Sequence, residues 1–274
     1  MISESLALGK RALTKWIRNP FAVIVTSLQA LFWLALFGNS FNPANAFGLS
    51  AGSLGPLQQA FGGAPNYITF LAPGVIGLVA LTGMSFMGVD LVFDKINGYL
   101  DVLRAFPIPR TSIYFGGVVQ NVAKGMVAAP ITFAIALVIP NGLELGQGFG
   151  ALSLVGIFAI VALLTGVFAT FFTGVAISVK STDSFFAAIN FLTFPIMFTS
   201  SAFFPLSFFP GWLKPVAQAN PITLASGAMR LMVNNTLSAS QVQTIVGDVA
   251  GLAAFSVVFT ILGILMARNA LKAR

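Results

Sequence analysis

The chain has 274 residues, of which 57% are hydrophobic and only 8% are charged, so it has too little polar surface to cover a water-soluble domain. It contains no Cys and no His, which excludes disulfides, thiolate nucleophiles, imidazole acid–base chemistry and the usual zinc and haem sites. The composition therefore predicts an all-α polytopic membrane protein, with residues 1–274 forming a single transmembrane domain.

Residues 1–19 are amphipathic at helical spacing. Leu6, Leu13, Trp16 and Ile17 would face lipid, while the basic residues between them reach the headgroups. This pattern predicts a helix that lies at the membrane interface. The alternative is a basic anchor that only sets the topology.

Six stretches with at most one charged residue each are long enough to cross a bilayer, which takes about 20 apolar residues. They are residues 20–37, 67–89, 113–139, 152–179, 184–204 and 249–267. With six spans both termini lie on one side, where eleven of the 14 basic residues fall, and only Lys214 and Arg230 lie on the other side. Because Lys and Arg concentrate in cytoplasmic loops, both termini are predicted to be cytoplasmic. The net charge of +7 therefore reflects topology and indicates no nucleic-acid partner.

Lys124 is the one charged residue inside a predicted span, where we expect it either to reach the inner headgroups or to pair with Asp90 or Asp94. Ion-driven carriers usually hold carboxylates near the middle of their spans, but Asp90, Asp183 and Asp248 fall near span ends. The sequence has no Walker A loop, and a catalytic set of Ser, His and acid needs a His. Neither an ion-coupled carrier nor an enzyme is favoured.

The segment 205–245, after the fifth span, is too apolar for a solvated loop, yet its four prolines prevent a continuous spanning helix. We expect short helices that re-enter the outer leaflet, or that lie flat at the interface. The candidate residues of this outer segment are Phe204, Pro205, Trp212, Asn220, Pro221 and Arg230.

Aromatic and methionine side chains crowd the fifth span and the inner half of the second. Such side chains suit a promiscuous apolar ligand because they adapt their shape and make soft contacts. We interpret them as a substrate path at a subunit interface, the alternative being ordinary packing or lipid contact. The candidates are Met84, Phe86, Met87, Phe191, Phe194, Met197 and Phe198.

The stretch FDKINGYLDVLRAFPIPRTSIYFGG, residues 93–117, is unusual in this chain because it concentrates charge, whereas no charged residue occurs between Arg18 and Asp90. It includes the predicted cytoplasmic loop 91–112. Polar residues and an apolar stripe at helical spacing could dock a soluble subunit there. The alternative is a plain interfacial loop.

This loop resembles the corresponding loop of ABC-2-type permeases, in which F-[DE]-[KR] is followed by G-[TY]-[LM]-[DE] and then by Pro. The segment FPLSFFPGWLKPVAQANPITLASGAMRLM, residues 204–232, is similar to the outer segment of that family, which has F-P, W-[LM], N-P and A-x-R in this order. The resemblance covers nearly the whole chain and is closest to the drug-export branch of the daunorubicin-resistance type. The chain departs from the family pattern at Asp94, where many relatives carry Glu, and at Asn97, where they carry Arg.

The resemblance implies the permease subunit of an ATP-binding-cassette exporter, which moves a drug-like or lipid-like compound outward through the plasma membrane of a prokaryote. It implies that the chain is not itself an enzyme and holds no cofactor, because a separate ATPase subunit binds ATP and Mg. It also implies a second permease copy, preferably identical, and makes 91–112 the coupling loop. The implied contacts to the ATPase are Asp94, Lys95, Gly98, Tyr99, Asp101, Leu103, Arg104 and Pro107. Export of a polysaccharide or lipid-linked glycan is one alternative, and a non-transporting membrane scaffold is another.

Overall fold

The structure is a computed structural model, and it describes residues 18–39, 61–98, 110–234 and 238–272, together with Lys10, Thr14 and Trp16. The regular structure in these residues is helical throughout, as the sequence predicts. In chain order the elements are α2 (Pro20–Trp33), the π-helical turn η1 (Leu34–Asn39), α5 (Tyr67–Ile96), α7 (Arg110–Val138), α8 (Ala151–Ser178), α9 (Thr182–Phe198), the 3₁₀ turn η3 (Leu206–Phe208), α10 (Lys214–Gln218), α11 (Pro221–Asn234) and α12 (Ala239–Lys272).

Three helices in the described residues are long and apolar enough to cross a membrane, namely Tyr114–Val138, Ala151–Ser178 and Ala239–Arg268. Shorter apolar helices are Ser27–Gly38, Tyr67–Gly83 and Thr182–Phe198. At about 1.5 Å per residue, a spanning helix needs about 20 residues to cross a hydrocarbon core of about 30 Å. Helices suit this environment because they satisfy their backbone polar groups internally. The chain is therefore a multi-pass helical membrane protein.

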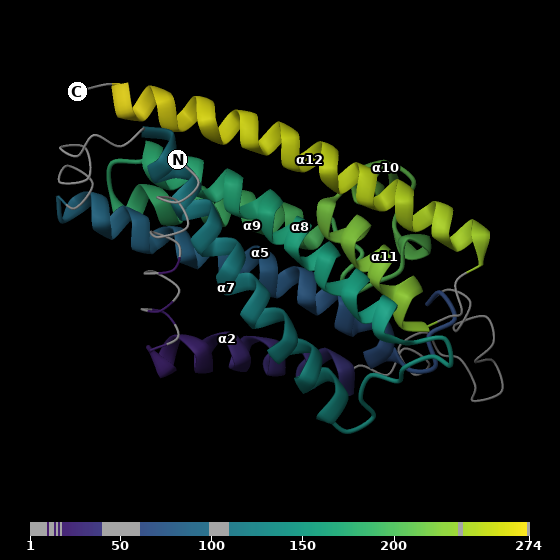
Figure 1. The fold of residues 1–274 in the computed structure, drawn as a ribbon. Coiled ribbons are helices and arrows are strands. Elements are labelled where there is room, and N and C mark those ends of the chain that lie inside the picture. The colour runs from purple at the N-terminus through teal and green to yellow at the C-terminus, as the bar shows by residue number, and fades with distance from the viewer. Residues whose placement is uncertain are drawn as a thin grey trace.

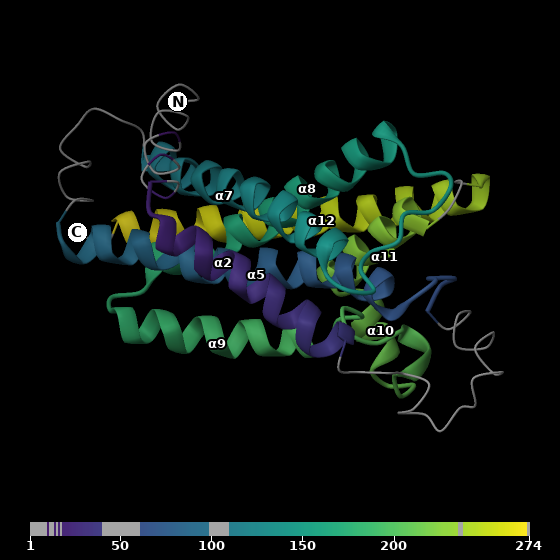
Figure 2. The same ribbon diagram turned by 90° about the horizontal axis from the view of Figure 1, so that it is seen from below.

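The long helices lie side by side and alternate in direction, so that the start of α2 and the end of α12 lie at the same end of the bundle (Figure 1). We call this the inner end, and the opposite end, which holds α10 and α11, the outer end. α8 is the central helix, because it packs against α5, α7, α11 and α12, and Val167, Phe168 and Phe172 in it are fully buried. α9 lies along α5 on the side away from α7 and α12 (Figure 2).

The crossing of α8 and α12 depends on two glycines. A Cβ atom on Gly174 would lie 2.7 Å from the Cα of Gly263, so neither helix has room for a side chain there. Next to this crossing the buried hydroxyl of Tyr114, in α7, donates a 2.9 Å hydrogen bond to the carbonyl of Thr170. Small residues at a helix crossing and interhelical hydrogen bonds are the usual means of holding helices together in lipid.

Two helices are longer than the predicted spans. The second predicted span, 67–89, continues as α5 to Ile96, and the chain leaves the helical direction just beyond it at Gly98, which has left-handed backbone at φ +76°. The predicted loop 91–112 therefore begins as helix. The sixth predicted span, 249–267, begins earlier, because α12 starts at Ala239 within the predicted segment 205–245.

The fifth predicted span, 184–204, is shorter than expected, because α9 ends at Phe198. The hydroxyl of Thr199 donates to the carbonyl of Pro195 at 2.8 Å, and the hydroxyl of Ser200 donates to the carbonyl of Met197 at 2.6 Å. The carbonyl of Met197 would have accepted from the N–H of Ser201 in a further turn, but that N–H donates instead to the hydroxyl of Thr223 at 2.9 Å.

Two expectations about side chains facing the membrane are wrong. Trp16 is 8% exposed and packs into the protein core, so it does not face lipid; most of segment 1–19 lies outside the described residues. Lys124 is 1% exposed inside the bundle, so its ammonium does not reach the headgroups. Asp90 and Asp94 are the two acidic partners expected for Lys124, and the side chain of Asp90 lies outside the described part of the structure.

Replacing Gly263 with Ala is expected to lower the free energy of unfolding by about 1–3 kcal/mol, because the added methyl would overlap the hydroxyl of Tyr114 and the carbonyl of Thr170. Gly247, in the same helix, is the matched control, since nothing lies within 4 Å of a Cβ added there. Gly247→Ala should leave stability unchanged or raise it by up to about 1 kcal/mol. Thermal unfolding in detergent measures both; equal melting temperatures would contradict the packing described for this crossing.

Candidate functional site

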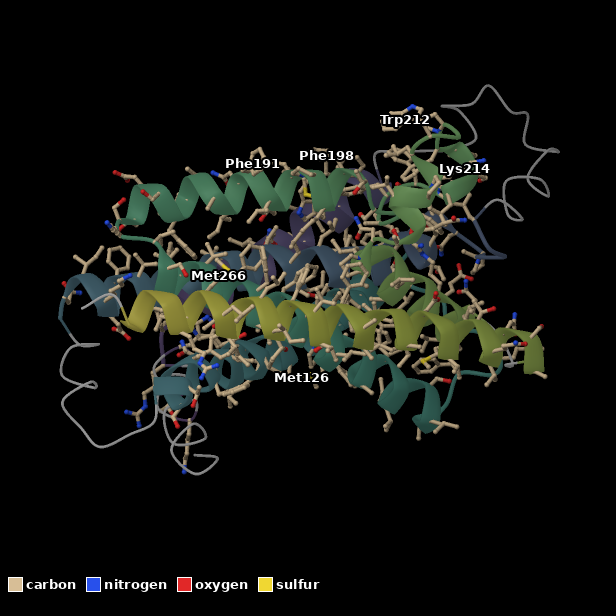
Figure 3. All side chains as sticks on the ribbon, turned by 90° about the horizontal axis from the view of Figure 1, so that it is seen from above. Met126, Phe191, Phe198, Trp212, Lys214 and Met266 are labelled. Atoms are coloured by element: carbon tan, nitrogen blue, oxygen red, sulfur yellow. The ribbon has the colours of Figure 1, made fainter. Side chains whose placement is uncertain are left out.

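One face of α9 presents a row of aromatic side chains that the rest of the described chain leaves uncovered. Phe191, Phe194 and Phe198 are 78%, 51% and 65% exposed. Their spacing of three and then four residues places them on one side of the helix, and the rings of Phe194 and Phe198 stack with centroids 6.3 Å apart. Figure 3 shows Phe191 and Phe198 pointing away from the bundle. We call these three residues the α9 aromatic face.

The other path candidates are distributed differently. Met197 is 5% exposed and belongs to the protein core, so it is not part of the aromatic face. The side chains of Met84, Phe86 and Met87 lie outside the described part of the structure, although their backbone belongs to α5. The structure therefore groups three of the seven candidates on one surface. Such a surface can contact lipid, a second protein subunit or an apolar compound.

At the outer end, Arg230 of α11 joins three parts of the chain. Its Nε donates to the carbonyl of Phe70 at 2.9 Å, and its guanidinium lies 3.7 Å from the centroid of the Phe70 ring. Its Nη2 donates to the carbonyl of Ser201 at 2.8 Å and to that of Ala202 at 3.4 Å, and its Nη1 donates to the hydroxyl of Ser201 at 3.3 Å. A planar guanidinium with several donors fits such a set of carbonyls, which an ammonium could serve less well. Arg230 thus ties α11 to α5 and to the turn after α9.

The same turn is held from two further sides. The hydroxyl of Tyr67 donates to the carbonyl of Phe203 at 2.9 Å, and the ring of Phe203 lies 5.1 Å from that of Trp33 and 4.8 Å from that of Phe37. Gly74 of α5 is packed so closely against Ala202 that a Cβ would collide with its carbonyl. α2, α5 and α11 therefore fix the outer end of α9.

The other residues of the predicted outer segment fall into two groups. Asn220 donates to the carbonyl of Ile196 at 2.7 Å, and its Oδ1 accepts from the backbone of Ile222 at 2.9 Å, so it caps α11 and also bonds to α9. Pro221 opens α11, where a missing N–H costs nothing. Pro205 is buried and Phe204 is half-buried, whereas Trp212 is 76% exposed and points outward at this end (Figure 3).

At the inner end the structure describes three of the eight predicted coupling residues. Asp94 and Lys95 lie in the last turn of α5, and both are half-buried. Gly98 ends this helix, and its N–H donates to the carbonyl of Lys95 at 3.2 Å. The ammonium of Lys95 donates to the carbonyls of Ile177 at 2.6 Å and of Val179 at 2.7 Å, at the end of α8. The remaining candidates, Tyr99, Asp101, Leu103, Arg104 and Pro107, lie outside the described residues.

Sequence reasoning did not identify Tyr67, Ser201 or Ala202 as parts of the outer site. Ala202 takes part through its backbone carbonyl, which every residue has, and Ser201 through its carbonyl and its hydroxyl; nothing in the sequence marks either one as a partner of Arg230. Tyr67 was detectable in principle, since a tyrosine at the end of an apolar span usually needs a partner for its hydroxyl.

Replacing Arg230 with Met is expected to lower the free energy of unfolding by about 1–3 kcal/mol, because several inward-facing carbonyls lose their donor. Arg230→Lys should recover only part of the loss. Lys214→Met is the matched control, since it removes another cation at the outer end. The melting temperature in detergent measures the effect. An Arg230→Met protein as stable as the Lys214→Met protein would contradict the role given to Arg230.

Comparison with known proteins identifies the family. Residues 4–234 match the family described as ABC-2 type transporter. The chain is 29% identical to the transport permease ycf38 of Porphyra purpurea, over 100% of this chain and 90% of the relative. It is 25% identical to a protein named as the doxorubicin resistance ABC transporter permease DrrC of Mycobacterium tuberculosis, over 84% and 76% of the two chains. It is also 25% identical to the daunorubicin resistance ABC transporter permease DrrB1 of Streptomyces coeruleorubidus, over 71% and 69%.

The family match covers most of the chain, and it agrees with the apolar helices and with the order of the motifs in the loop and the outer segment. The protein therefore belongs to the ABC-2 type transporter family of membrane permeases.

Proposed function

We propose that this chain is the transmembrane subunit of an ATP-driven exporter, and that it moves a hydrophobic or amphipathic compound outward. The α9 aromatic face carries the proposal, because it offers an apolar compound a continuous row of rings that the described chain leaves uncovered. The names of two relatives refer to resistance to doxorubicin and daunorubicin, which supports a drug-like or lipid-like cargo over a glycan. ATP and Mg belong to a separate ATPase subunit in this proposal.

The proposed topology has six spans, formed by α2 with η1, α5, α7, α8, α9 and α12. Their alternating direction in Figure 1 supports it. The inner end carries Arg18, Lys95, Lys180 and Arg268, which supports a cytoplasmic inner end and cytoplasmic termini. α9 has 17 residues and is about 25 Å long, shorter than the hydrocarbon core. The segment from η3 to α11 would then re-enter the outer leaflet and cover the end of α9.

The proposed working unit is a dimer of permease copies, with a homodimer favoured over a heterodimer. It lies in the plasma membrane of a prokaryote, and the α9 faces of the two copies line a path between them. A helix surface that exposes Phe191 and Phe198 is suited to such a position because a second copy, or the compound itself, would cover it. The loop that follows α5 is the proposed coupling loop. Asp94, in the last turn of α5, and Asp101 and Arg104, in the loop, would contact the ATPase, with Tyr99, Leu103 and Pro107 beside them.

Replacing Phe194 with Trp is expected to change drug resistance several-fold in cells that produce the chain with its ATPase, because the larger ring alters the width of the path. Val258→Trp is the matched control, since Val258 is also about half exposed, at 51%, but lies on α12, away from α9. Both variants must be produced at equal levels. If Phe194→Trp and Val258→Trp give the same resistance as the wild type, the α9 aromatic face is not the path.

Replacing both Asp94 and Arg104 with Ala is expected to weaken co-purification with the ATPase and to reduce its stimulated ATP hydrolysis. The control is the double variant Lys180→Ala with Asp183→Ala, which removes one basic and one acidic residue at another inner position: Lys180 lies between α8 and α9, and Asp183 lies in the first turn of α9. Unchanged association and hydrolysis in the first variant would show that 91–112 is not the coupling loop.

A further inference from the structure

Lys95 lies in the last turn of α5, but its ammonium reaches a different helix. The Nζ atom donates to the carbonyl of Ile177 at 2.6 Å and to the carbonyl of Val179 at 2.7 Å. At least two of its three N–H groups are therefore engaged inside the protein. Ile177 is 1% exposed, and Val179 is the C-cap residue that directly follows α8.

The carbonyls of Ile177 and Val179 lie at the C-terminal end of a helix, where a positive charge is stabilising. The last carbonyls of a helix have no partner within it, and the negative end of the helix dipole attracts a positive charge. Val179 donates its own N–H back to Val175 at 3.1 Å, which leaves the carbonyls of Ile177 and Val179 pointing beyond the helix end. Lys95 binds both, so the end of α5 and the end of α8 are joined by charge-assisted hydrogen bonds.

The end of α8 leads directly into α9. Ser181, three residues after α8, accepts a hydrogen bond from the backbone of Ser184 at 3.2 Å and thereby caps the start of α9. In the first turns of α9 the buried ring of Phe185 packs directly on Gly88 of α5, so that a Cβ atom on Gly88 would collide with it. α5 therefore holds the junction between α8 and α9 at two points, one polar and one aromatic.

We propose that Lys95 is a positioning residue that couples the ATPase-facing loop to the α8–α9 junction, and that it is not itself a contact to the ATPase. The inference rests on the proposed function, because it concerns how a movement supplied by the ATPase would be passed from α5 to α9. Displacement of the end of α5 pulls on the carbonyls of Ile177 and Val179. Because these carbonyls precede α9, the displacement reaches the helix that carries the aromatic face.

The test compares Lys95→Met, which keeps the length of the side chain and removes the hydrogen bonds, with Lys95→Arg, which can still donate to both carbonyls. Lys180→Met is the control, because Lys180 is an exposed lysine in the same inner region. Each variant is co-purified with the ATPase and reconstituted into liposomes, where ATP hydrolysis and transport are measured together. If Lys95→Met gives no folded protein, Lys95→Gln, which is too short to reach both carbonyls, replaces it.

Lys95→Met should retain association and ATP hydrolysis but move at least about fivefold less compound per ATP, a typical size for coupling between two sites. Lys95→Arg should recover most of the transport, and Lys180→Met should behave like the wild type. Loss of association in Lys95→Met would make Lys95 a docking contact and overturn the proposal. Unchanged transport per ATP in Lys95→Met would also overturn it.

A second measurement separates this inference from the proposed function. The chain has no Cys, so cysteines placed at Ile96 and Lys180 can carry two spin labels whose separation reports the position of α5 relative to the α8–α9 junction. The distance distribution should broaden in Lys95→Met and stay narrow in Lys95→Arg, whether or not an ATPase is present. An unchanged distribution in Lys95→Met would overturn the inference. Failure of the wild-type chain to associate with any ATPase would instead overturn the proposed function.

Discussion

Carbonyl groups at helix ends are the constraint on which this structure depends. A helix in an apolar layer satisfies its own backbone except at its ends, where the last carbonyls lack both a helical partner and water. Two cations from other helices bind carbonyls at a helix end or in the turn just beyond one here. Lys95 of α5 binds those of Ile177 and Val179 at the end of α8, and Arg230 of α11 binds that of Ser201 beyond the end of α9. Each cation therefore also fixes how two helices meet.

α5 takes part in both arrangements. Near its start the carbonyl and ring of Phe70 contact Arg230, and in its last turn Lys95 holds the end of α8. α9 is thus anchored beside α5 at both ends, while the side that carries Phe191 and Phe198 has no cover within the described chain. A helix fixed at both ends but open along one face suits the proposed role of α9, because it can present a defined surface to a compound or to a second copy.

The sequence was sufficient for the helical class and for the apolar stretches, because the length and hydropathy of a helix are local properties. The spacing of Phe191, Phe194 and Phe198 was also sufficient to place these residues on one side of a helix. The burial of Trp16 and Lys124 was not, because hydropathy does not distinguish a side chain that faces lipid from one that faces another helix. The partners of Lys95 and Arg230 could not be predicted either, because backbone carbonyls leave no mark in a sequence.

In the proposed function, this permease moves an apolar compound with energy from ATP that a partner subunit hydrolyses. The most direct measurement uses proteoliposomes that contain the purified chain and its ATPase, with doxorubicin as the compound followed across the bilayer. ATP, but not a non-hydrolysable analogue, is expected to drive doxorubicin across the membrane away from the side that bears the ATPase. ATP hydrolysis by the complex with no net movement of doxorubicin or of a labelled lipid would contradict it.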